Sequence, residues 1–578
     1  MGIPMGRSPK CWAKTFCGCY NKSGSNESGP LGPGIRGGWR MSRVATIAVA
    51  SATVLLGGLV AGVGGMASAH ARVHPAATAA TGSITMEING DPNFNLWNPS
   101  AYVDSDNIDP LIFSGLTKDN LQGLPAPDLA TSWHATDHGL QWVFDLRKGV
   151  RWQNGQPFTA QDVLYTFNDV VLNPKLGANG ASNYSDVTNV TANGKYQVVF
   201  HLKQPWSSLP AYLTFFAPIL PAQVLQHEGT KLWTDAAFGT QHPIGTGPYE
   251  VQSVQPGQSI TLVRNPYYFG AKPSIPKIVF QIIPDATTVV SDLLNGDLNF
   301  AEVDDPQLIS GLKRDPSLTV TRVPEQNYYN ITLNGREAPF NNVKVRQALE
   351  YAINRPAIIK GLLKGYGTVA NGPIGPIQKY FYDPNVENYP YDPAKAVRLL
   401  EQAGMRKGPG GKMYYHGKPF TIYMPTAQYG YLVPLSELVQ QYWKNIGVTA
   451  NIKVMDFNSW IEASVIKLDF QATASWWIAP LTPDVYPYFA SSTIKNGYNV
   501  QGIGIPKLDR LMTALRAATS LAAQKKLADE VQVEIAKEEP LGFLFYPEMV
   551  DVTSSNLYVP PVNYNIALDN VADWHFKT

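Results

Sequence analysis

The chain has 578 residues, of which 44% are hydrophobic and only 16% are charged. So much apolar material builds packed cores, which excludes disorder over the whole length. The 46 basic and 45 acidic residues leave a formal charge of +1, without the excess of positive charge that nucleic-acid binding requires.

The first part of the chain is predicted to direct export and not to belong to the fold. Residues 44–65 carry no charge, follow a short stretch that contains arginines, and precede the small-residue sequence Ala69-His70-Ala71. A basic region, an apolar region and a cleavage site in this order are typical of a signal peptide. We therefore interpret 41–71 as an export signal that is removed before Arg72. The alternative is an uncleaved anchor, because a helix of this length could span a bilayer of about 30 Å.

Residues 1–40 are predicted to be disordered or to precede the true start at Met41. The three cysteines, Cys11, Cys17 and Cys19, all lie here, and without a partner histidine or a paired C-x-x-C they form only a weak zinc pattern. Without residues 1–71 the chain has no cysteine, so it has neither a disulfide nor a thiol nucleophile. It then carries a net charge of about −5, because seven basic residues and one acidic residue leave with the leader.

After a linker over 72–81, alternating apolar and polar residues predict a first strand over 82–88. From there, short strand patterns alternate with amphipathic helical patterns, which indicates an α/β chain with many loops. Thr159 is followed three residues later by Asp162, a short-armed form of the capping box that begins a helix. Further strands are predicted over 142–146, 196–202 and 259–263, and further helices over 343–353, 393–403, 508–517 and 522–537.

The sequence lacks the short motifs of common catalytic sites. It has no G-x-S-x-G nucleophile elbow and no H-E-x-x-H zinc motif, and its glycine-rich stretch 408–412 lacks the spacing of a phosphate-binding loop. The histidines are scattered, and a bare nickel ion would need a cluster of imidazole or thiolate ligands. We therefore predict that the protein is not an enzyme and that it carries no cofactor and no metal.

Several blocks of sequence occur in a characteristic order along the chain. One is Pro243-Ile244-Gly245-Thr246-Gly247-Pro248-Tyr249, whose turn is predicted to need the backbone freedom of glycine before a strand at Tyr249. Another is Tyr351-Ala352-Ile353-Asn354-Arg355. The remaining blocks are 113–116 with 127–133, 146–150 with 158–163, 264–268, 294–297, 345–349, and 391–396 with 399–404.

Together these blocks resemble the extracellular solute-binding proteins of peptide, dipeptide and nickel ABC importers, known as family 5. The resemblance covers nearly all of 82–578. It implies an α/β fold with the two lobes of a periplasmic-binding protein (type II, cluster C) and an additional inserted subdomain. The expected first lobe is formed by 82–114, 243–338 and 541–578, the inserted subdomain by 115–242, and the second lobe by 339–540.

The resemblance also implies a function. Such a protein traps a small ligand between its lobes by hinge closure and delivers it to the permease subunits of an ABC importer. We expect a monomer at the periplasmic or extracellular face of the cell membrane, with a di- or oligopeptide as ligand and with no nucleic-acid partner. The blocks themselves are interpreted as scaffold, since their apolar residues recur at helical or strand spacing.

One wall of the ligand pocket is implied by Trp476, Trp477 and Ile478. In peptide-binding members the matching stretch is usually followed by an aspartate that pairs with the α-amino group of the peptide. Here Pro480 stands at that position, and the nearest acid is Asp484. Because an unpaired buried ammonium is costly, either Asp484 takes this role from a shifted loop or the ligand has no free amine.

A second pocket segment on the opposite lobe is implied for Tyr102, Val103 and Asp104. Tyr184 and Asn499 are further candidates, chosen from loops that could line the cleft. An aromatic pocket of this kind suits a peptide, or a sugar stacked on the indole rings. The alternatives to peptide import are a sugar-binding member of the same family, a sensing or chaperone-like binding protein, and a secreted hydrolase.

Overall fold

The computed structural model of the chain describes residues 82–98, 104–214, 217–234, 237–303, 305–479, 482–495, 497–561 and 567–577. The predicted leader, export signal and linker, residues 1–81, lie outside the described residues, and so do Tyr102 and Val103.

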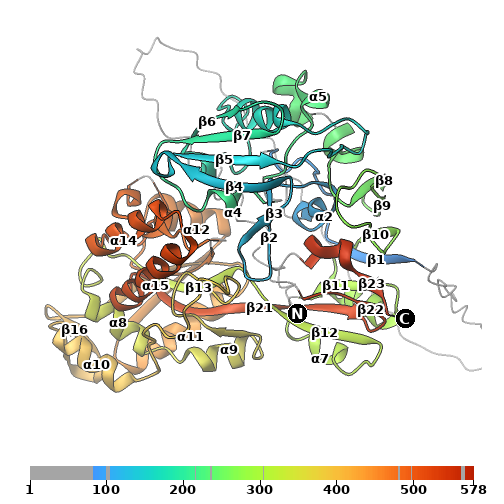
Figure 1. The fold of residues 1–578 in the computed structure, drawn as a ribbon. Helices are drawn as coiled ribbons and strands as arrows, with labels where there is room; N and C mark the ends of the chain where they lie inside the picture. The colour runs from blue at the N-terminus through green and yellow to red at the C-terminus, as the bar shows by residue number, and fades with distance from the viewer. Residues whose placement is uncertain are drawn as a thin grey trace, which may run out of the picture. The chain divides into compact units, whose positions relative to one another are not determined.

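A ten-stranded mixed sheet is the largest sheet of the fold (Figure 1). Its strands follow the order β20-β13-β21-β11-β1-β10-β9-β8, and β12 and β14 also pair with β21. β1 is parallel to β10 and β11, whereas β21 is antiparallel to all its neighbours. The strands are β1 (Ser83–Ile88), β8 (Tyr249–Gln255), β9 (Ser259–Arg264), β10 (Lys277–Ile282), β11 (Phe300–Val303), β12 (Leu318–Pro324), β13 (Asn327–Leu333), β14 (Gly367–Val369), β20 (Ala472–Ile478) and β21 (Gly542–Ser554).

A second, antiparallel sheet has the order β4-β5-β7-β6. Helix α3 (Ala160–Leu164) packs on β6 and β7, and a hairpin of two short strands precedes the sheet. The strands are β2 (Thr117–Asp119) and β3 (Pro125–Pro127) in the hairpin, then β4 (Ala130–Thr136), β5 (Gln141–Leu146), β6 (Val187–Ala192) and β7 (Gln197–Leu202).

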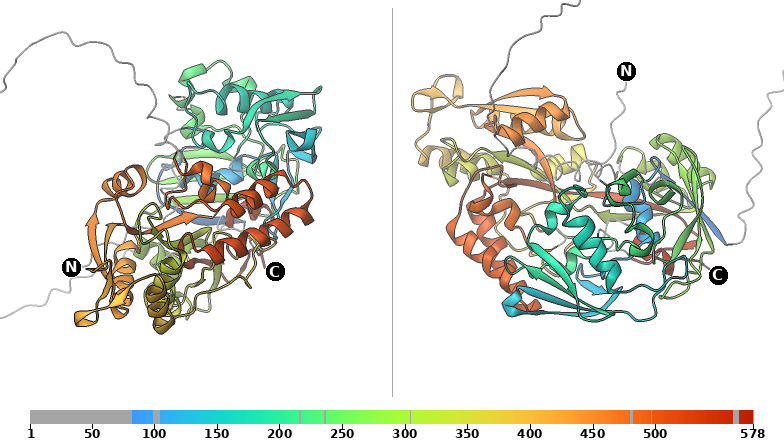
Figure 2. Two further views of the ribbon diagram at one scale, coloured as in Figure 1. Left: turned by 90° about the vertical axis from the view of Figure 1, so that its left-hand side faces the viewer. Right: turned by 90° about the horizontal axis from the view of Figure 1, so that it is seen from above.

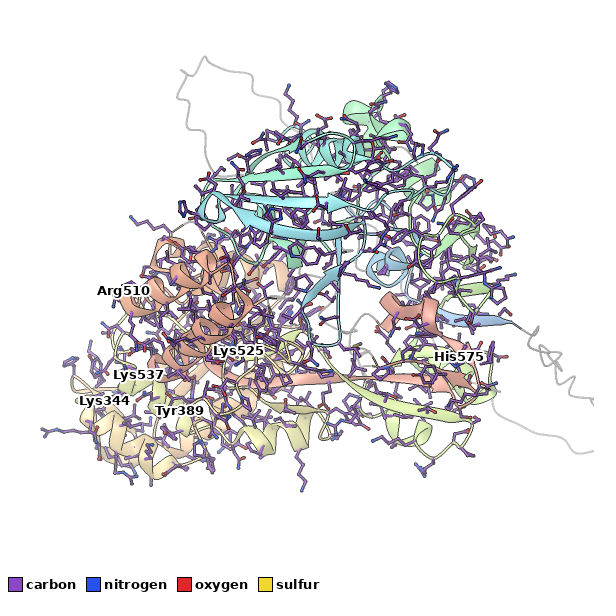
Figure 3. The ribbon with its side chains drawn as sticks, in the orientation of Figure 1. Lys344, Tyr389, Arg510, Lys525, Lys537 and His575 are labelled. Carbon is purple, nitrogen blue, oxygen red and sulfur yellow. The ribbon has the colours of Figure 1, made fainter. Side chains whose placement is uncertain are left out.

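Most of the longer helices lie between residues 343 and 538. α14 and α15 pack side by side (Figure 2), and exposed charged residues such as Arg510 and Lys537 lie on their outer surfaces (Figure 3). The helices are α8 (Val343–Tyr351), α9 (Arg355–Leu362), α10 (Pro393–Gln402), α11 (Leu432–Asn445), α14 (Pro506–Ala517) and α15 (Leu521–Glu538), next to a parallel pair of strands, β18 (Thr421–Ala427) and β19 (Thr449–Met455).

The remaining α-helices and strands lie elsewhere along the described chain. They are the helices α2 (Asp104–Ile112), α4 (Leu209–Tyr212), α5 (Ala222–Leu225), α6 (Ala286–Asn295), α7 (Ile309–Leu312), α12 (Phe457–Trp460) and α13 (Tyr486–Phe489), and the strands β15 (Arg406–Lys407), β16 (Met413–Tyr415), β17 (Lys418–Pro419), β22 (Leu557–Tyr558) and β23 (His575–Phe576).

Three buried apolar clusters of the described residues contribute to the core. The first joins β1 and the four-stranded sheet, from Ile84 to Phe280, and continues to Trp574 near the C-terminus. The second surrounds α14 and α15, and the third surrounds α6 and α7. β21 belongs to two of them, because Phe543 packs in the second cluster and Val550 in the third. This one long strand therefore ties the helical segment to the rest of the large sheet.

The predicted elements are confirmed to within two residues at each end, which is the ordinary uncertainty of element boundaries. The capping box is also present: the backbone N–H of Gln161 donates to Thr159 Oγ1, and that of Thr159 donates to Asp162 Oδ2. The predicted lobe boundaries remain a prediction. The contacts of the described residues form one compact unit that does not divide at 115, 243, 339 or 541.

The turn before β8 contains its glycines for a reason other than the one predicted. Neither Gly245 nor Gly247 has a positive φ. A Cβ on Gly245 would lie 1.9 Å from the carbonyl oxygen of Ile112, and one on Gly247 would lie 2.6 Å from its carbonyl carbon. The turn therefore requires glycine because the end of α2 passes directly against it.

Candidate ligand-binding site

β20, which carries the predicted pocket wall, is an edge strand. Among the described strands only β13 pairs with it, in an antiparallel register that sets Asn327 opposite Ile478. The pair is extended at both ends by backbone hydrogen bonds, from Ala479 N–H to Gln326 O and from Asn334 N–H to Gln471 O. Because hydrogen-bonded residues alternate along an antiparallel strand, the odd-numbered residues of β20 bond to β13.

It follows that Trp476 and Ile478 direct their backbone N–H and C=O groups toward the open edge. The start of β20 packs against β18: the N–H of Gln471, the residue before the strand, donates to Tyr423 O, and Thr473 Oγ1 donates to Pro425 O. The second half, from Trp476 to Ile478, is half-buried. The end of this strand thus presents a short row of hydrogen-bonding groups to which an extended chain could pair.

Aromatic rings flank this open edge on both faces of the sheet. On one face Trp476 stacks on Tyr429, with ring centroids 5.1 Å apart, and on Trp460, with centroids 6.2 Å apart. On the other face Trp477 packs against Tyr488 at 5.6 Å and Tyr498 at 6.4 Å. The expectation that the two tryptophans lie on opposite faces of a strand is confirmed.

Asp484 lies in a buried ion pair. Its Oδ2 is 3.1 Å from Nε of Arg516, and its side chain is 5% exposed. The N–H of Tyr486 donates to its Oδ1. Burial raises the pKa of Asp484, and the charge of Arg516 opposes this rise. A ligand ammonium would have to displace Arg516 to reach this carboxylate, and Pro480 lies outside the described residues.

The other candidate residues occupy different surroundings. Tyr184 is buried in the first core, where its Oη donates to Tyr212 O at 2.6 Å. Asn499 organises its own loop: its Nδ2 donates to two backbone carbonyls and its Oδ1 accepts from Gly502 N–H. Asp104 begins α2, but its side chain is not described. The structure therefore brings Trp476, Trp477 and Ile478 together and gives Tyr184 and Asn499 packing roles.

Sequence reasoning missed the aromatic residues that surround the two tryptophans. Tyr429, Phe457, Tyr488 and Tyr498 come from separate loops and helices, and only the fold brings them to β20. The general abundance of aromatic residues was the sole signal for them. Sequence reasoning also missed Arg516, which is 32 residues away from Asp484, the acid that it neutralises.

A surface hollow of about 630 Å³ lies on the four-stranded sheet. Its one acid, Asp145, already accepts hydrogen bonds from Gln197 and Ser132, which lower the pKa of this carboxyl. We assign no ligand to it. Its lining residues are Thr131, Asp145, Leu146, Lys148, Asn193, Tyr196 and Gln197. Over the described residues, no group of three or more His, Cys, Asp or Glu side chains could hold a metal ion.

Comparison with known proteins identifies the class to which this fold and site belong. The family model of bacterial extracellular solute-binding proteins, family 5, matches residues 125–499, which is more than half of the chain. The chain therefore belongs to this family, as its sequence blocks indicated. Members of the family are binding proteins of transport systems and not enzymes.

Individual relatives are similar over most of their length. The chain is 29% identical over 500 residues to the oligopeptide-binding protein AppA of Bacillus subtilis (strain 168), covering 85% of this chain and 91% of the relative. It is 29% identical over 440 residues to the dipeptide-binding protein of Escherichia coli (strain K12), covering 72% of this chain and 79% of that one. The solved structure of AppA from Bacillus subtilis with a nonapeptide superposes with a TM-score of 0.68 at 27% identity, covering 86% and 99% of the two chains.

These comparisons confirm the expected fold, that of family 5 periplasmic-binding proteins. From residue 82 onward, none of the helices that the structure describes is both long and apolar enough to cross a membrane. The apolar segment 44–65 lies outside those residues, so cleavage or retention of the export signal stays a prediction.

Proposed function

We propose that the protein captures an extended peptide at the open end of β20 and delivers it to the permease of an ABC importer. The observation that carries this proposal is the edge at Trp476 and Ile478, where no other described strand pairs with β20 and aromatic rings lie on both faces. A peptide that adds a strand there would alternate its side chains between the two aromatic clusters. The relatives named for oligopeptides and dipeptides support the same ligand class.

The surroundings of the edge favour apolar peptide side chains over charged ones. Each face offers aromatic rings, and the one described acid in the following loop, Asp484, is already neutralised by Arg516. We infer that Asp484 does not read the amino terminus of the ligand. Binding is therefore expected to tolerate acetylation of that terminus.

The test is a panel of thermal-shift measurements on residues 72–578. The panel compares di-, tri- and longer apolar peptides, the same peptides after N-acetylation, length-matched charged peptides, and oligosaccharides. A ligand at about one hundred times its Kd that binds only the folded state adds about 2.7 kcal/mol of stability. We expect equal shifts with free and acetylated apolar peptides and smaller shifts with charged ones.

Each other result has a definite meaning. A shift that disappears on acetylation would show that an amine is read and that Arg516 can be displaced from Asp484. A response to oligosaccharides alone would replace peptide uptake with the alternative of a sugar-binding member. Peptide binding without any neighbouring permease and ATPase genes would favour the sensing or chaperone-like alternative.

Export belongs to this proposal as well. We infer that the signal over 41–71 is removed and that the mature protein begins near Arg72 and acts as a monomer outside the cytoplasm. The mass of the N-terminal peptide from protein isolated from its host tests the cleavage, and detection of an intact 44–65 segment would indicate a retained anchor. Light scattering of the purified protein tests the monomer.

A further inference from the structure

The C-terminal end of α14 is held by a residue that is distant in sequence. The backbone N–H of Ser207 donates to Arg516 O at 2.8 Å, and Ser207 Oγ donates to Leu515 O at 2.9 Å. Carbonyls in the last turn of a helix lack intrahelical partners and need donors from elsewhere. Ser207 thus provides such donors from segment 115–242 to a helix of segment 339–540.

Arg516 joins the same two segments through its side chain. Its Nη2 is 2.5 Å from Oδ2 of Asp186, in segment 115–242, and its Nε is 3.1 Å from Oδ2 of Asp484, in segment 339–540. The Arg516 side chain is 9% exposed, so solvent screens these pairs only weakly. Its guanidinium also lies over the ring of Tyr486, 5.1 Å from the centroid. One cation therefore neutralises an acid from each segment.

These contacts adjoin the aromatic wall of the ligand site. Asp484 and Tyr486 belong to the loop and helix that follow β20, and the same short helix α13 carries Tyr488, which packs against Trp477. Holding Asp484 in place therefore also holds the ring that flanks the open edge. A second attachment lies at the hairpin tip, where Tyr380 N–H donates to Gln122 O at 3.3 Å.

We propose that Arg516 is a positioning residue that, with Asp186 and Ser207, clasps segment 115–242 onto segment 339–540 and raises the fraction of closed, binding-competent molecules. The inference rests on the proposed function for its link to ligand affinity, but the clasp itself consists of contacts within the protein. When the binding-competent state is only partly populated, the apparent affinity falls in proportion to its population. Loosening the clasp therefore weakens binding without removing any ligand contact.

The test uses the purified protein with Asp186→Asn and, separately, with Ser207→Ala. Asp186→Asn removes one charge of the clasp, whereas Ser207→Ala removes only one hydroxyl. Ser207→Ala is therefore expected to fold even if Asp186→Asn does not. Asp169→Asn is the matched control, because Asp169 is exposed in the same segment and no described ion pair includes it. Small-angle X-ray scattering of the ligand-free proteins reports opening, and calorimetry reports the affinity for the apolar peptide that the wild type binds best.

We expect a larger radius of gyration for Asp186→Asn than for the wild type and the control, and about tenfold weaker peptide affinity. Ser207→Ala should change both quantities in the same direction by less. Radii of gyration and peptide affinities equal to those of the control would refute the proposed role of the clasp. Weaker affinity at an unchanged radius would also overturn it and would place Asp186 in the ligand wall. If the wild type binds no peptide, the scattering comparison still decides the clasp, and only the proposed function fails.

Discussion

Arg355 allows a direct test of whether the family-resembling blocks are scaffold. It is the first residue of α9 and is 3% exposed. Its Nη1 donates to Ala370 O at 2.7 Å and to Phe543 O at 2.9 Å. Its Nη2 donates to Tyr389 O at 3.0 Å (Tyr389 is labelled in Figure 3). Nη1 also lies 3.3 Å from Oε1 of the buried Glu350. The guanidinium thus joins α8, α9, two loops and β21.

The substitution Arg355→Met retains much of the side-chain volume but removes the cation. Glu350 then loses its buried counter-ion, and the three carbonyls lose their donor. Removing one partner of a buried ion pair costs about 3–5 kcal/mol. Since a folded domain is stable by only about 5–15 kcal/mol, the unfolding free energy should fall by a large fraction.

Urea unfolding followed by tryptophan fluorescence measures this loss. The matched control is Arg398→Met, because Arg398 is 60% exposed and lies 3.9 Å from Asp392, so its loss should change the unfolding free energy by no more than about 0.5 kcal/mol. Adding Glu350→Gln to Arg355→Met should recover part of the loss, since an unpaired amide costs less to bury than a charge. A loss below about 1 kcal/mol, or weaker ligand binding at an unchanged unfolding midpoint, would refute the scaffold interpretation.

Three further predictions concern single residues. Trp477→Ala should weaken peptide binding about tenfold or more, which is the effect of losing a contact worth at least about 1.4 kcal/mol. The thermal midpoint of the ligand-free protein should stay within a few degrees of the wild-type value. Unchanged affinity by calorimetry would remove Trp477 from the site. Burial raises the pKa of Asp162 to about 6, although hydrogen bonds from backbone N–H groups oppose this rise. The folded state therefore holds the proton of Asp162 more tightly than the unfolded state does, and the fold loses stability as pH rises from about 4 to about 6. At about 1.4 kcal/mol for each pKa unit, this loss reaches up to about 3 kcal/mol. Asp162→Asn lacks this dependence, so its unfolding free energy should rise relative to that of the wild type across this window in urea titrations, and parallel curves would contradict the assignment. Tyr184→Phe removes the 2.6 Å hydrogen bond to Tyr212 O and should cost about 1 kcal/mol of stability with no change in affinity; a drop in affinity would make Tyr184 a ligand contact.

The local sequence pattern was sufficient to predict the structure where a residue interacts with near neighbours in the chain. The capping box joins Thr159 and Asp162, which are three positions apart, and both of its hydrogen bonds are present. Trp476 and Trp477 occupy adjacent positions in a strand, and their opposite faces follow from its period of two. Val345 and Leu349 lie one turn apart on α8, and both are buried as their spacing predicts.

The order of the blocks along the chain was enough to indicate the family, since it reflects a complete fold and not one local contact. It could not supply the reason for each residue. The glycines before β8 looked like a conformational requirement, but they are required because the carbonyl of Ile112 approaches them. That approach joins residues more than one hundred positions apart, and no periodicity encodes it.

The partners of the candidate site were decided by tertiary structure alone. From the sequence, Asp484 was the nearest acid for a ligand amine, whereas the fold places Arg516 beside it and pairs the same guanidinium with Asp186. The open edge at Trp476 likewise depends on which strand pairs with β20, and β13 lies about 145 residues away. Sequence by itself determined the helices, the strands and the family, because these depend on short-range periodicity and on ordered motifs. Only the packed chain determined which charges and rings meet, because contacts between distant segments are selected by the burial of the whole core.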